Sequence, residues 1–115
     1  MKVIIAGGRD FNDYEKLCRF CDKVLSKQNE IEIVSGTARG ADKLGEKYAV
    51  DNGYDIKRFP ADWDRYGKSA GYRRNAQMAE YADALIAFWD GKSKGTEHMI
   101  NLANTVNLKV RVNYF

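Results

Sequence analysis

Three glycine-containing segments have the composition of a site for an anionic ligand. They read GGRDF over residues 7–11, SGTARGAD over residues 35–42 and WDGKSKGT over residues 89–96, and each follows a short apolar run. Glycine lets backbone amides approach a ligand closely, and the N-terminus of a following helix presents unpaired N–H donors with a partial positive charge. Such a set of donors suits phosphate, so a nucleotide or a sugar phosphate is the expected ligand.

Charged and aromatic side chains in or near these segments supply further contacts. Arg9, Arg39 and Arg74 can form forked, charge-assisted bonds to phosphate, and Phe11 or Trp89 can stack on a base. The full set of expected ligand-binding residues is Gly7, Gly8, Arg9, Phe11, Ser35, Gly36, Thr37, Arg39, Gly40, Asp42, Arg74, Asn75, Trp89, Gly91, Gly95 and Thr96.

Oxygen-bearing side chains in these segments have both structural and binding interpretations. Asp42 either stabilises the N-terminus of a helix or accepts a bond from a ribose hydroxyl, and the sequence does not choose between the two. Ser35, Thr37 and Thr96 have no evident base to activate them. We therefore interpret their hydroxyls as phosphate ligands or helix caps and not as nucleophiles.

The simplest alternative is that these glycines only make tight strand-to-helix turns. One loop alone would favour that interpretation, whereas three loops converging on one place favour a site. Two known fingerprints are absent: the first segment lacks the spacing of the dinucleotide motif, and Ile86 stands where a phosphate-binding loop ending in GKS at residues 91–93 needs its leading glycine. Hydride transfer and P-loop ATP hydrolysis are therefore not expected.

Other reactive residue types receive structural interpretations. Asp62 and Asp64 suit turns better than a metal site, and neither a metal nor a cofactor is expected. Cys18 and Cys21 fall inside a helical pattern, where they are expected to be buried or half-buried thiols. His98 is the only histidine, and we interpret it as a surface residue.

The elements that position these residues follow from hydrophobic periodicity. Short apolar runs alternate with longer segments of helical spacing, so the strands are connected by single helices and must run parallel. Asn12 and Glu15 form a capping-box pattern at one helix, Asn52 and Gly53 end another, and Pro60 opens an irregular loop over residues 60–72. The expected strands cover residues 3–6, 31–34, 56–59, 84–88 and 108–112.

This alternation predicts a single α/β domain over residues 1–115, a doubly wound, Rossmann-like three-layer sandwich. The expected strand order in its five-stranded parallel sheet is 3-2-1-4-5. With that order the loops that leave the first, second and fourth strands meet at the carboxyl edge of the sheet, where ligands bind in this architecture. Trp63, Tyr66 and Tyr72 lie in or next to the irregular loop and are expected in a lid or a subunit contact, with Tyr72 a further stacking residue.

Composition excludes several classes of protein. The 115 residues are 44% hydrophobic and 30% charged, which is enough to build a core and argues against disorder. No apolar run approaches the length of a membrane span, and the first residues do not have the pattern of a secretory signal, so a cytoplasmic protein is expected. The net charge of +3 permits an anionic ligand but falls short of a dedicated duplex-DNA binder.

Six motifs together resemble one known family. GGRDF, SGTARGAD, FPADW, AGYRRN, ADALIAFWDG and KGTEHM are similar to the small SLOG-superfamily proteins related to YspA and YpsA, and the likeness covers nearly the whole chain. This resemblance implies a Rossmann-like pocket for a nucleotide or a nucleotide derivative. Arg74, Met78 and Asp83 resemble a motif of the LOG phosphoribohydrolases in the same superfamily, but Met99 occupies the position of their catalytic glutamate.

The resemblance implies a protein that binds an ADP-ribose-like molecule or a nucleoside monophosphate, as a sensor, carrier or sequestering protein. Two alternatives stay open. One is an enzyme that cleaves an N-glycosidic bond, although methionine can neither accept a proton nor offset positive charge. The other is single-stranded DNA binding of the kind implied by similarity to DprA, although interleaved acidic residues make a nucleic-acid partner the less favoured one. A homodimer or a larger homo-oligomer is also expected, and a membrane partner is not.

Overall fold

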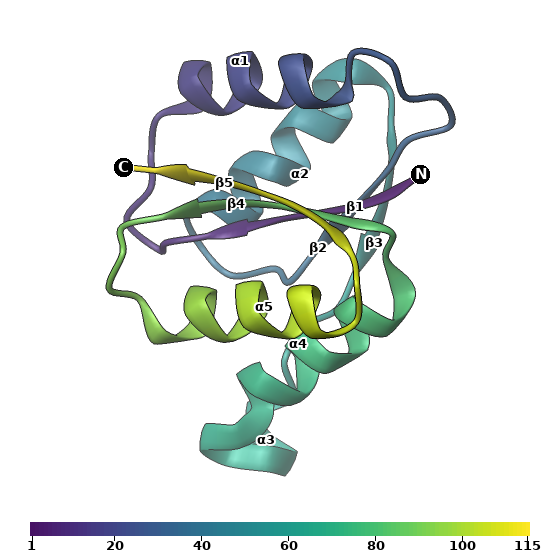
Figure 1. Ribbon diagram of the computed structural model, residues 1–115. Helices are drawn as coiled ribbons and strands as arrows, with labels where there is room; N and C mark the ends of the chain where they lie inside the picture. The colour runs from purple at the N-terminus through teal and green to yellow at the C-terminus, as the bar shows by residue number, and fades with distance from the viewer.

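The five strands form one parallel sheet in the computed structural model, which describes all residues from 1 to 115 (Figure 1). The strand order is β3-β2-β1-β4-β5, so the predicted order is confirmed. Every neighbouring pair is parallel, as single-helix crossovers require. The strands are β1 (Lys2–Gly7), β2 (Glu32–Ser35), β3 (Asp55–Arg58), β4 (Ala84–Trp89) and β5 (Lys109–Tyr114).

Helices cover both faces of this sheet and complete three layers. In Figure 1, α1 and α2 lie on one face and α4 and α5 on the other, with α3 beyond the end of α4. The helices are α1 (Tyr14–Leu25), α2 (Ala41–Asn52), α3 (Trp63–Tyr66), α4 (Ala70–Tyr81) and α5 (Lys94–Thr105), and a short 3₁₀ helix, η1 (Gly67–Ser69), joins α3 to α4. No helix is long and apolar enough to cross a membrane.

Apart from the exposed Lys2 that begins β1, the central strands β1 and β4 are apolar, because each face of the sheet meets a different helical layer. In β1, Val3 and Ile5 pack in the cluster beneath α1 and α2, whereas Ile4 and Ala6 pack in the cluster beneath α4 and α5. Alternate residues of a strand point to opposite faces, so a strand buried on both sides carries no polar alternation. This double burial makes β1 a rigid support for the loop that follows it.

Local signals at the ends of elements were only partly predictive. Asp13, and not Asn12, caps α1, because its side chain accepts a hydrogen bond from the backbone N–H of Lys16 at 3.0 Å. Gly53 ends α2 in the left-handed conformation, as predicted, and its N–H bonds to carbonyls of the last turn. The irregular loop expected over residues 60–72 contains α3 and η1, because Asp62 caps a short helix through the N–H of Arg65 at 3.1 Å.

Both cysteines lie on α1 as free thiols. Cys21 is fully buried and Cys18 is half-buried, in agreement with their expected packing role. Burial raises the pKa of the Cys21 thiol, so this group stays protonated and unreactive.

Candidate ligand-binding site

The loop after β1 contacts the end of the loop after β2 and the end of strand β4 at the carboxyl edge of the sheet. The carbonyl oxygen of Gly8 accepts a hydrogen bond from the N–H of Ala41 at 3.2 Å, and the N–H of Gly8 donates to the carbonyl oxygen of Phe88 at 3.0 Å. Gly40 lies against the same loop, where a Cβ would overlap the oxygen of Gly8 and lie 2.6 Å from the oxygen of Arg9. The loops after β1 and β2 are therefore in direct contact, and the loop after β4 contributes Asp90 and Ser93 to the cavity that they border.

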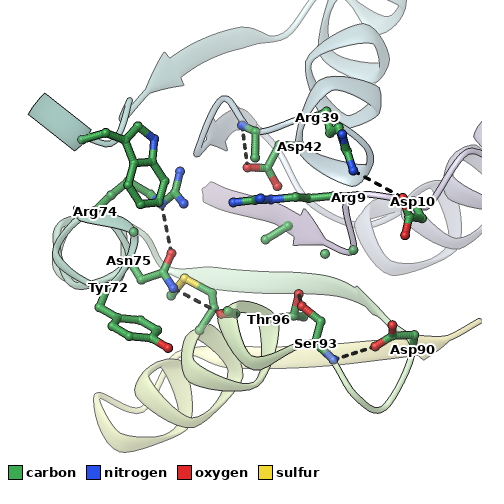
Figure 2. Close-up of a pocket in the computed structure, with 18 of the residues that line it drawn as sticks. Arg9, Asp10, Arg39, Asp42, Tyr72, Arg74, Asn75, Asp90, Ser93 and Thr96 are labelled. Atoms are coloured by element: carbon green, nitrogen blue, oxygen red, sulfur yellow. Dashed lines mark hydrogen bonds and ion pairs between the residues drawn. The ribbon is translucent and has the colours of Figure 1, made fainter. Parts of the chain in front are cut away.

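A cavity of about 450 Å³ opens where these loops meet α4 (Figure 2). Its walls come from the loop after β1, the start of α2, the α3–α4 segment and the start of α5. The predicted site residues that line it are Gly7, Gly8, Arg9, Arg39, Asp42, Arg74, Asn75, Gly95 and Thr96. Gly36 and Thr37 line an adjacent cavity of about 410 Å³, which shares Arg9, Arg39 and Arg74 with the first.

Other predicted site residues lie outside this cavity. Phe11 was expected to stack on a base, but it is buried in the core and stacks on Phe88 with ring centroids 4.7 Å apart. The indole N–H of Trp89 donates to the carbonyl oxygen of Ser93 at 3.1 Å, and its ring packs against Tyr114. Both stacking predictions are corrected on this geometry.

Three further predicted residues shape the loops without lining the cavity. Ser35 is fully buried, so it is not a phosphate ligand here. Gly40 packs against the backbone of Gly8 and Arg9 in the loop after β1. Gly91 has a positive φ of 82° and nothing near its Cβ position, so its role is to turn the chain between β4 and α5.

Several lining residues had no clear signal in the sequence. Phe115 comes from the far end of the chain, and its ring lies 2.7 Å from the position of a Cβ on Gly8. Trp63 and Tyr72 line the cavity from α3 and α4. The sequence predicts both in a lid or a subunit contact, and Tyr72 as a stacking residue. With Phe115 they are the aromatic rings of the cavity wall, which does not include Phe11 or Trp89. The remaining unpredicted lining residues are Ala6, Asp10, Ala38, Lys68, Gly71, Asp90, Ser93 and Met99.

Two arginine side chains in the cavity have no carboxylate partner. Arg9 forms no hydrogen bond and no ion pair with its side chain, and Arg74 donates only to the backbone oxygen of Gly36 and, at 3.1 Å, to Oδ1 of Asn75. Burial, together with the charge of Arg9, lowers the pKa of Arg74, and the charge of Asp42 opposes this. Two cations without a carboxylate partner therefore face the same cavity.

The N-terminus of α5 adds open backbone donors. Oδ1 of Asp90 accepts hydrogen bonds from the N–H groups of Lys92 and Ser93, each at 2.8 Å, and these bonds hold the pKa of Asp90 below its ordinary value. The next N–H groups, those of residues 94–96, have no acceptor within the protein. Figure 2 shows Ser93 and Thr96 on the cavity side of this helix. Donors of this kind bind anions.

Asp42 is the one strongly buried carboxylate in the cavity wall. Asp42 is only 5% exposed, and its Oδ2 accepts a hydrogen bond from the N–H of Ala38 at 3.1 Å. Burial raises the pKa of Asp42 to about 6, helped by the charge of Glu46 and opposed by the Ala38 bond, Arg74 and Lys43. Oδ1 has no partner in the protein.

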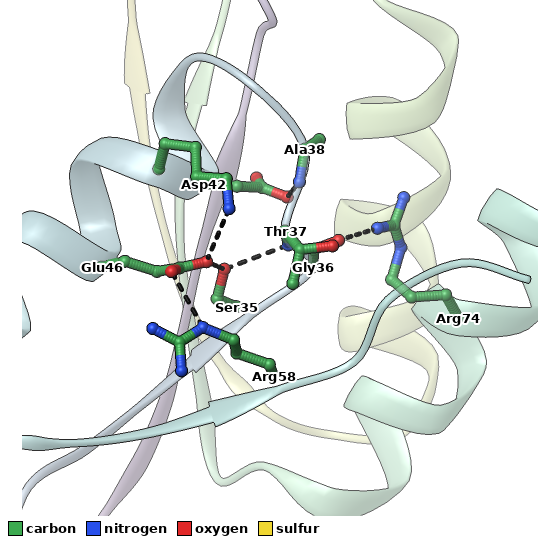
Figure 3. A network of polar contacts seen from close by, with 9 residues as sticks. Ser35, Gly36, Thr37, Ala38, Asp42, Glu46, Arg58 and Arg74 are labelled. Carbon is green, nitrogen blue, oxygen red and sulfur yellow. Dashed lines mark hydrogen bonds and ion pairs between the residues drawn. The ribbon is translucent and has the colours of Figure 1, made fainter.

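A polar network beneath the site holds the β2–α2 loop in place (Figure 3). Ser35 donates from Oγ to Oε2 of Glu46 at 2.6 Å and accepts from the N–H of Thr37 at 3.1 Å. Arg58 donates to Oε1 of Glu46 at 3.0 Å, and Lys43 lies 3.8 Å from Oε2. Although burial opposes them, the bonds from Ser35 and Arg58 hold the pKa of Glu46 below its ordinary value. Thr37, at a positive φ of 65°, is therefore kept in a conformation that threonine rarely adopts.

The Ser35→Ala variant should lose about 1–3 kcal/mol of unfolding free energy, because it removes the hydrogen bond to Oε2 of Glu46 and leaves the Thr37 N–H without a partner. Urea denaturation measures this loss. The exposed Ser26, whose hydroxyl bonds only to the backbone of its own helix, is the matched control, and Ser26→Ala should change stability by less than about 0.5 kcal/mol. Equal losses in the two variants would contradict a stabilising role for the network.

The fold is that of a Rossmann-like α/β protein, with a cavity at the carboxyl ends of the parallel strands, where ligands bind in this architecture. Residues 1–66 match the model of the YspA, cpYpsA-related SLOG family, and this chain belongs to that family. It is 31% identical over 116 residues to the Gene 61 protein of Mycobacterium phage D29, covering 95% of this chain and 93% of the phage protein.

A solved structure confirms the architecture. DNA processing protein A from Helicobacter pylori, described for its single-stranded DNA binding mode, superposes with a TM-score of 0.71 at 20% sequence identity. The match covers 97% of this chain and 64% of that protein, so the present chain spans less than two thirds of it. At this level of identity the likeness shows the fold.

Proposed function

We propose that the cavity binds the phosphate of a nucleotide-type ligand between Arg9, Arg74 and the N-terminus of α5. The observation that carries this proposal is the pair of guanidinium groups that face one cavity without a carboxylate partner. Arg74 is half-buried, where an unpaired cation is costly, and an anion between it and the exposed Arg9 offsets their repulsion. Membership of the SLOG family supports a nucleotide-related ligand.

The phosphate is expected at α5 and not at α2. Both helices start at the cavity, but the first turn of α2 carries the carboxylate of Asp42, which would repel an anion. At α5, Asp90 is already bonded to two backbone N–H groups, and the following amides are open. Glu97 also lies in the first turn of α5, but it does not line the cavity. Charge-assisted bonds from the two arginines would complete the set of donors.

Base stacking is assigned to the aromatic residues of the α3–α4 segment. Trp63 is 51% exposed and Tyr72 is 47% exposed, and both line the cavity. Aromatic rings exposed at a cavity wall offer a flat surface to a base. The ring of Tyr72 also rests on His98, with centroids 4.5 Å apart, which holds it in position.

Binding without cleavage of the glycosidic bond is the favoured activity. Met99, which occupies the position of the hydrolase glutamate, lines the cavity and is 1% exposed, so it gives this wall an apolar side chain. Incubation of the protein with nucleoside monophosphates should release no free base. Release of base at a rate that depends on protein concentration would overturn this part of the proposal.

The Arg9→Ala variant should bind AMP and ADP-ribose about 10-fold or more weakly, the loss expected for one charge-assisted contact. Because the Arg9 side chain bonds to no other residue, the fold should not change. Isothermal titration calorimetry measures both affinities. Arg19→Ala is the matched control, since it removes an equal charge from the exposed face of α1 and should leave affinity within about twofold. No binding of either nucleotide to the unmodified protein would contradict the proposed function.

Single-stranded DNA is a second candidate, favoured by one observation. Lys68 lines the cavity together with the exposed rings of Trp63 and Tyr72. Proteins that bind single-stranded DNA combine basic side chains with aromatic side chains on which the bases stack. A gel-shift titration with a short oligothymidylate at two salt concentrations tests this candidate. Binding that weakens steeply with salt would support it, and a flat or absent response would remove it.

A further inference from the structure

We propose that Asp42 accepts a hydrogen bond from a hydroxyl group of the ligand's sugar, so that the cavity selects ribonucleotides over their deoxy analogues. This inference rests on the proposed function, because it concerns the sugar of the same ligand. It assigns a specificity-determining role to Asp42, whose carboxyl group has only one of its two oxygens hydrogen-bonded within the protein.

The geometry of Asp42 leaves one acceptor for a ligand. Oδ2 is occupied by the N–H of Ala38 at 3.1 Å, and this bond fixes the orientation of the carboxyl group. Oδ1 has no protein partner, although the residue is only 5% exposed and lines the cavity. In Figure 2 the carboxyl group points into the space in front of Arg9. No buried polar side-chain atom of the protein lacks a hydrogen-bond partner, so the unpaired Oδ1 is open to the cavity and can accept a bond from a ligand there.

The neighbouring cations do not satisfy this acceptor. Asp42 and Arg74 lie on either side of Gly36, where a Cβ would lie 2.8 Å from Oδ2 of Asp42 and 2.7 Å from Nη1 of Arg74. Arg74 nevertheless donates to the backbone oxygen of Gly36 and forms no ion pair with Asp42. The remaining groups that act on this carboxyl are Lys43, which is exposed and paired with Glu46, and Glu46 itself, which is an anion.

A carboxylate in a cavity that binds phosphate needs a neutral donor as its partner. A phosphate at Asp42 would add a second negative charge to a desolvated anion, so the phosphate must sit at the cationic part of the cavity. The sugar is the part of a nucleotide bonded directly to the phosphate, and its hydroxyls are neutral donors. Figure 2 places Asp42 across the cavity from Tyr72, so a base stacked on that ring leaves the sugar between the two side chains.

The test compares AMP with its 2′-deoxy and 3′-deoxy analogues by calorimetry, using the wild-type protein and the Asp42→Asn variant. Asparagine keeps the shape of the side chain and can still accept the Ala38 N–H through its carbonyl oxygen. The wild type should bind one of the two deoxy analogues about 10-fold or more weakly than AMP, the loss expected for a hydrogen bond to a charged group. In Asp42→Asn this difference should fall below about threefold.

The variant also distinguishes a role in ligand specificity from a purely structural role of Asp42, because the affinities for AMP and for the disfavoured deoxy analogue should change differently. Removing the negative charge should leave the affinity for the disfavoured deoxy analogue unchanged or higher, while the affinity for AMP falls. Equal binding of all three nucleotides by the wild type would overturn the inference and leave the proposed function intact. Equal weakening of all three in the variant would also overturn it. Failure of every nucleotide to bind the wild type would instead reject the proposed function.

Discussion

The Gly40→Ala variant is expected to lose about 1–3 kcal/mol more unfolding free energy than Gly53→Ala, although both glycines have a positive φ. At Gly53, with φ 72°, a Cβ meets no atom within 4 Å, so alanine adds only the strain of a left-handed conformation, about 1–2 kcal/mol. At Gly40, with φ 79°, the Cβ would overlap the oxygen of Gly8 as well, and overpacking of this kind typically costs about 1–3 kcal/mol.

The comparison reports the contact between the loops after β1 and β2 together with the backbone conformation of Gly40, whose ψ of −129° lies outside the left-handed helical region that Gly53 adopts. To accommodate alanine at position 40 the chain must move the loop that carries Arg9, so Gly40→Ala should also weaken nucleotide binding whereas Gly53→Ala should not. Urea denaturation and calorimetry measure the two effects. Equal losses of unfolding free energy in the two variants would mean that the loops can move apart without destabilising the fold. The contact between them would then not contribute to the shape of the cavity.

The Asp42→Asn variant is expected to gain about 1–3 kcal/mol of unfolding free energy at pH 7 in the absence of a ligand. Burial raises the pKa of Asp42 from its ordinary value of 3.8 to about 6, and each unit corresponds to about 1.4 kcal/mol. A carboxyl with a raised pKa favours the folded state only while it is protonated. Its contribution is therefore present below about pH 4 and is lost as the pH rises through about 6.

The pH dependence of the difference between Asp42→Asn and wild type checks this sign. The two proteins should have similar stability near pH 4, and the variant should become progressively more stable up to about pH 6 and keep that advantage above it. Asp90→Asn is the control of opposite sign: the pKa of Asp90 is lowered by bonds from Ser93 and Lys92, so its removal should destabilise the protein at neutral pH. A constant difference between Asp42→Asn and wild type across this pH range would contradict the account of Asp42.

These two substitutions also separate what the sequence could predict from what it could not. The strand order and the meeting of three loops follow from the alternation of strands and helices, because parallel connections return every strand to the same edge. Glycine and arginine in those loops then indicated the position of the cavity. The state of Asp42 was open in the sequence, since only the fold decides how deeply the first turn of α2 is buried and which of its donors are used.

The aromatic residues show most clearly what the sequence could not predict about the site. Phe11 lies in the loop after β1 and Trp89 is the last residue of β4, but neither lines the cavity: Phe11 packs on Phe88, and Trp89 packs on Tyr114. Local sequence does not distinguish a ring that stacks on a ligand from one that completes the core, because both are apolar and adjacent to a loop. The ring of Phe115 reaches Gly8 across most of the chain length, and only the sheet order brings the two together.

The central claim, that a nucleotide phosphate binds between Arg9, Arg74 and the start of α5, is tested most directly by amide chemical shifts in ¹⁵N-labelled protein titrated with AMP. We predict the largest changes at the backbone amides of Arg9, Gly95 and Thr96, which line the cavity. Saturating changes confined to α1 and β5, or no changes at the three amides at millimolar AMP, would contradict it.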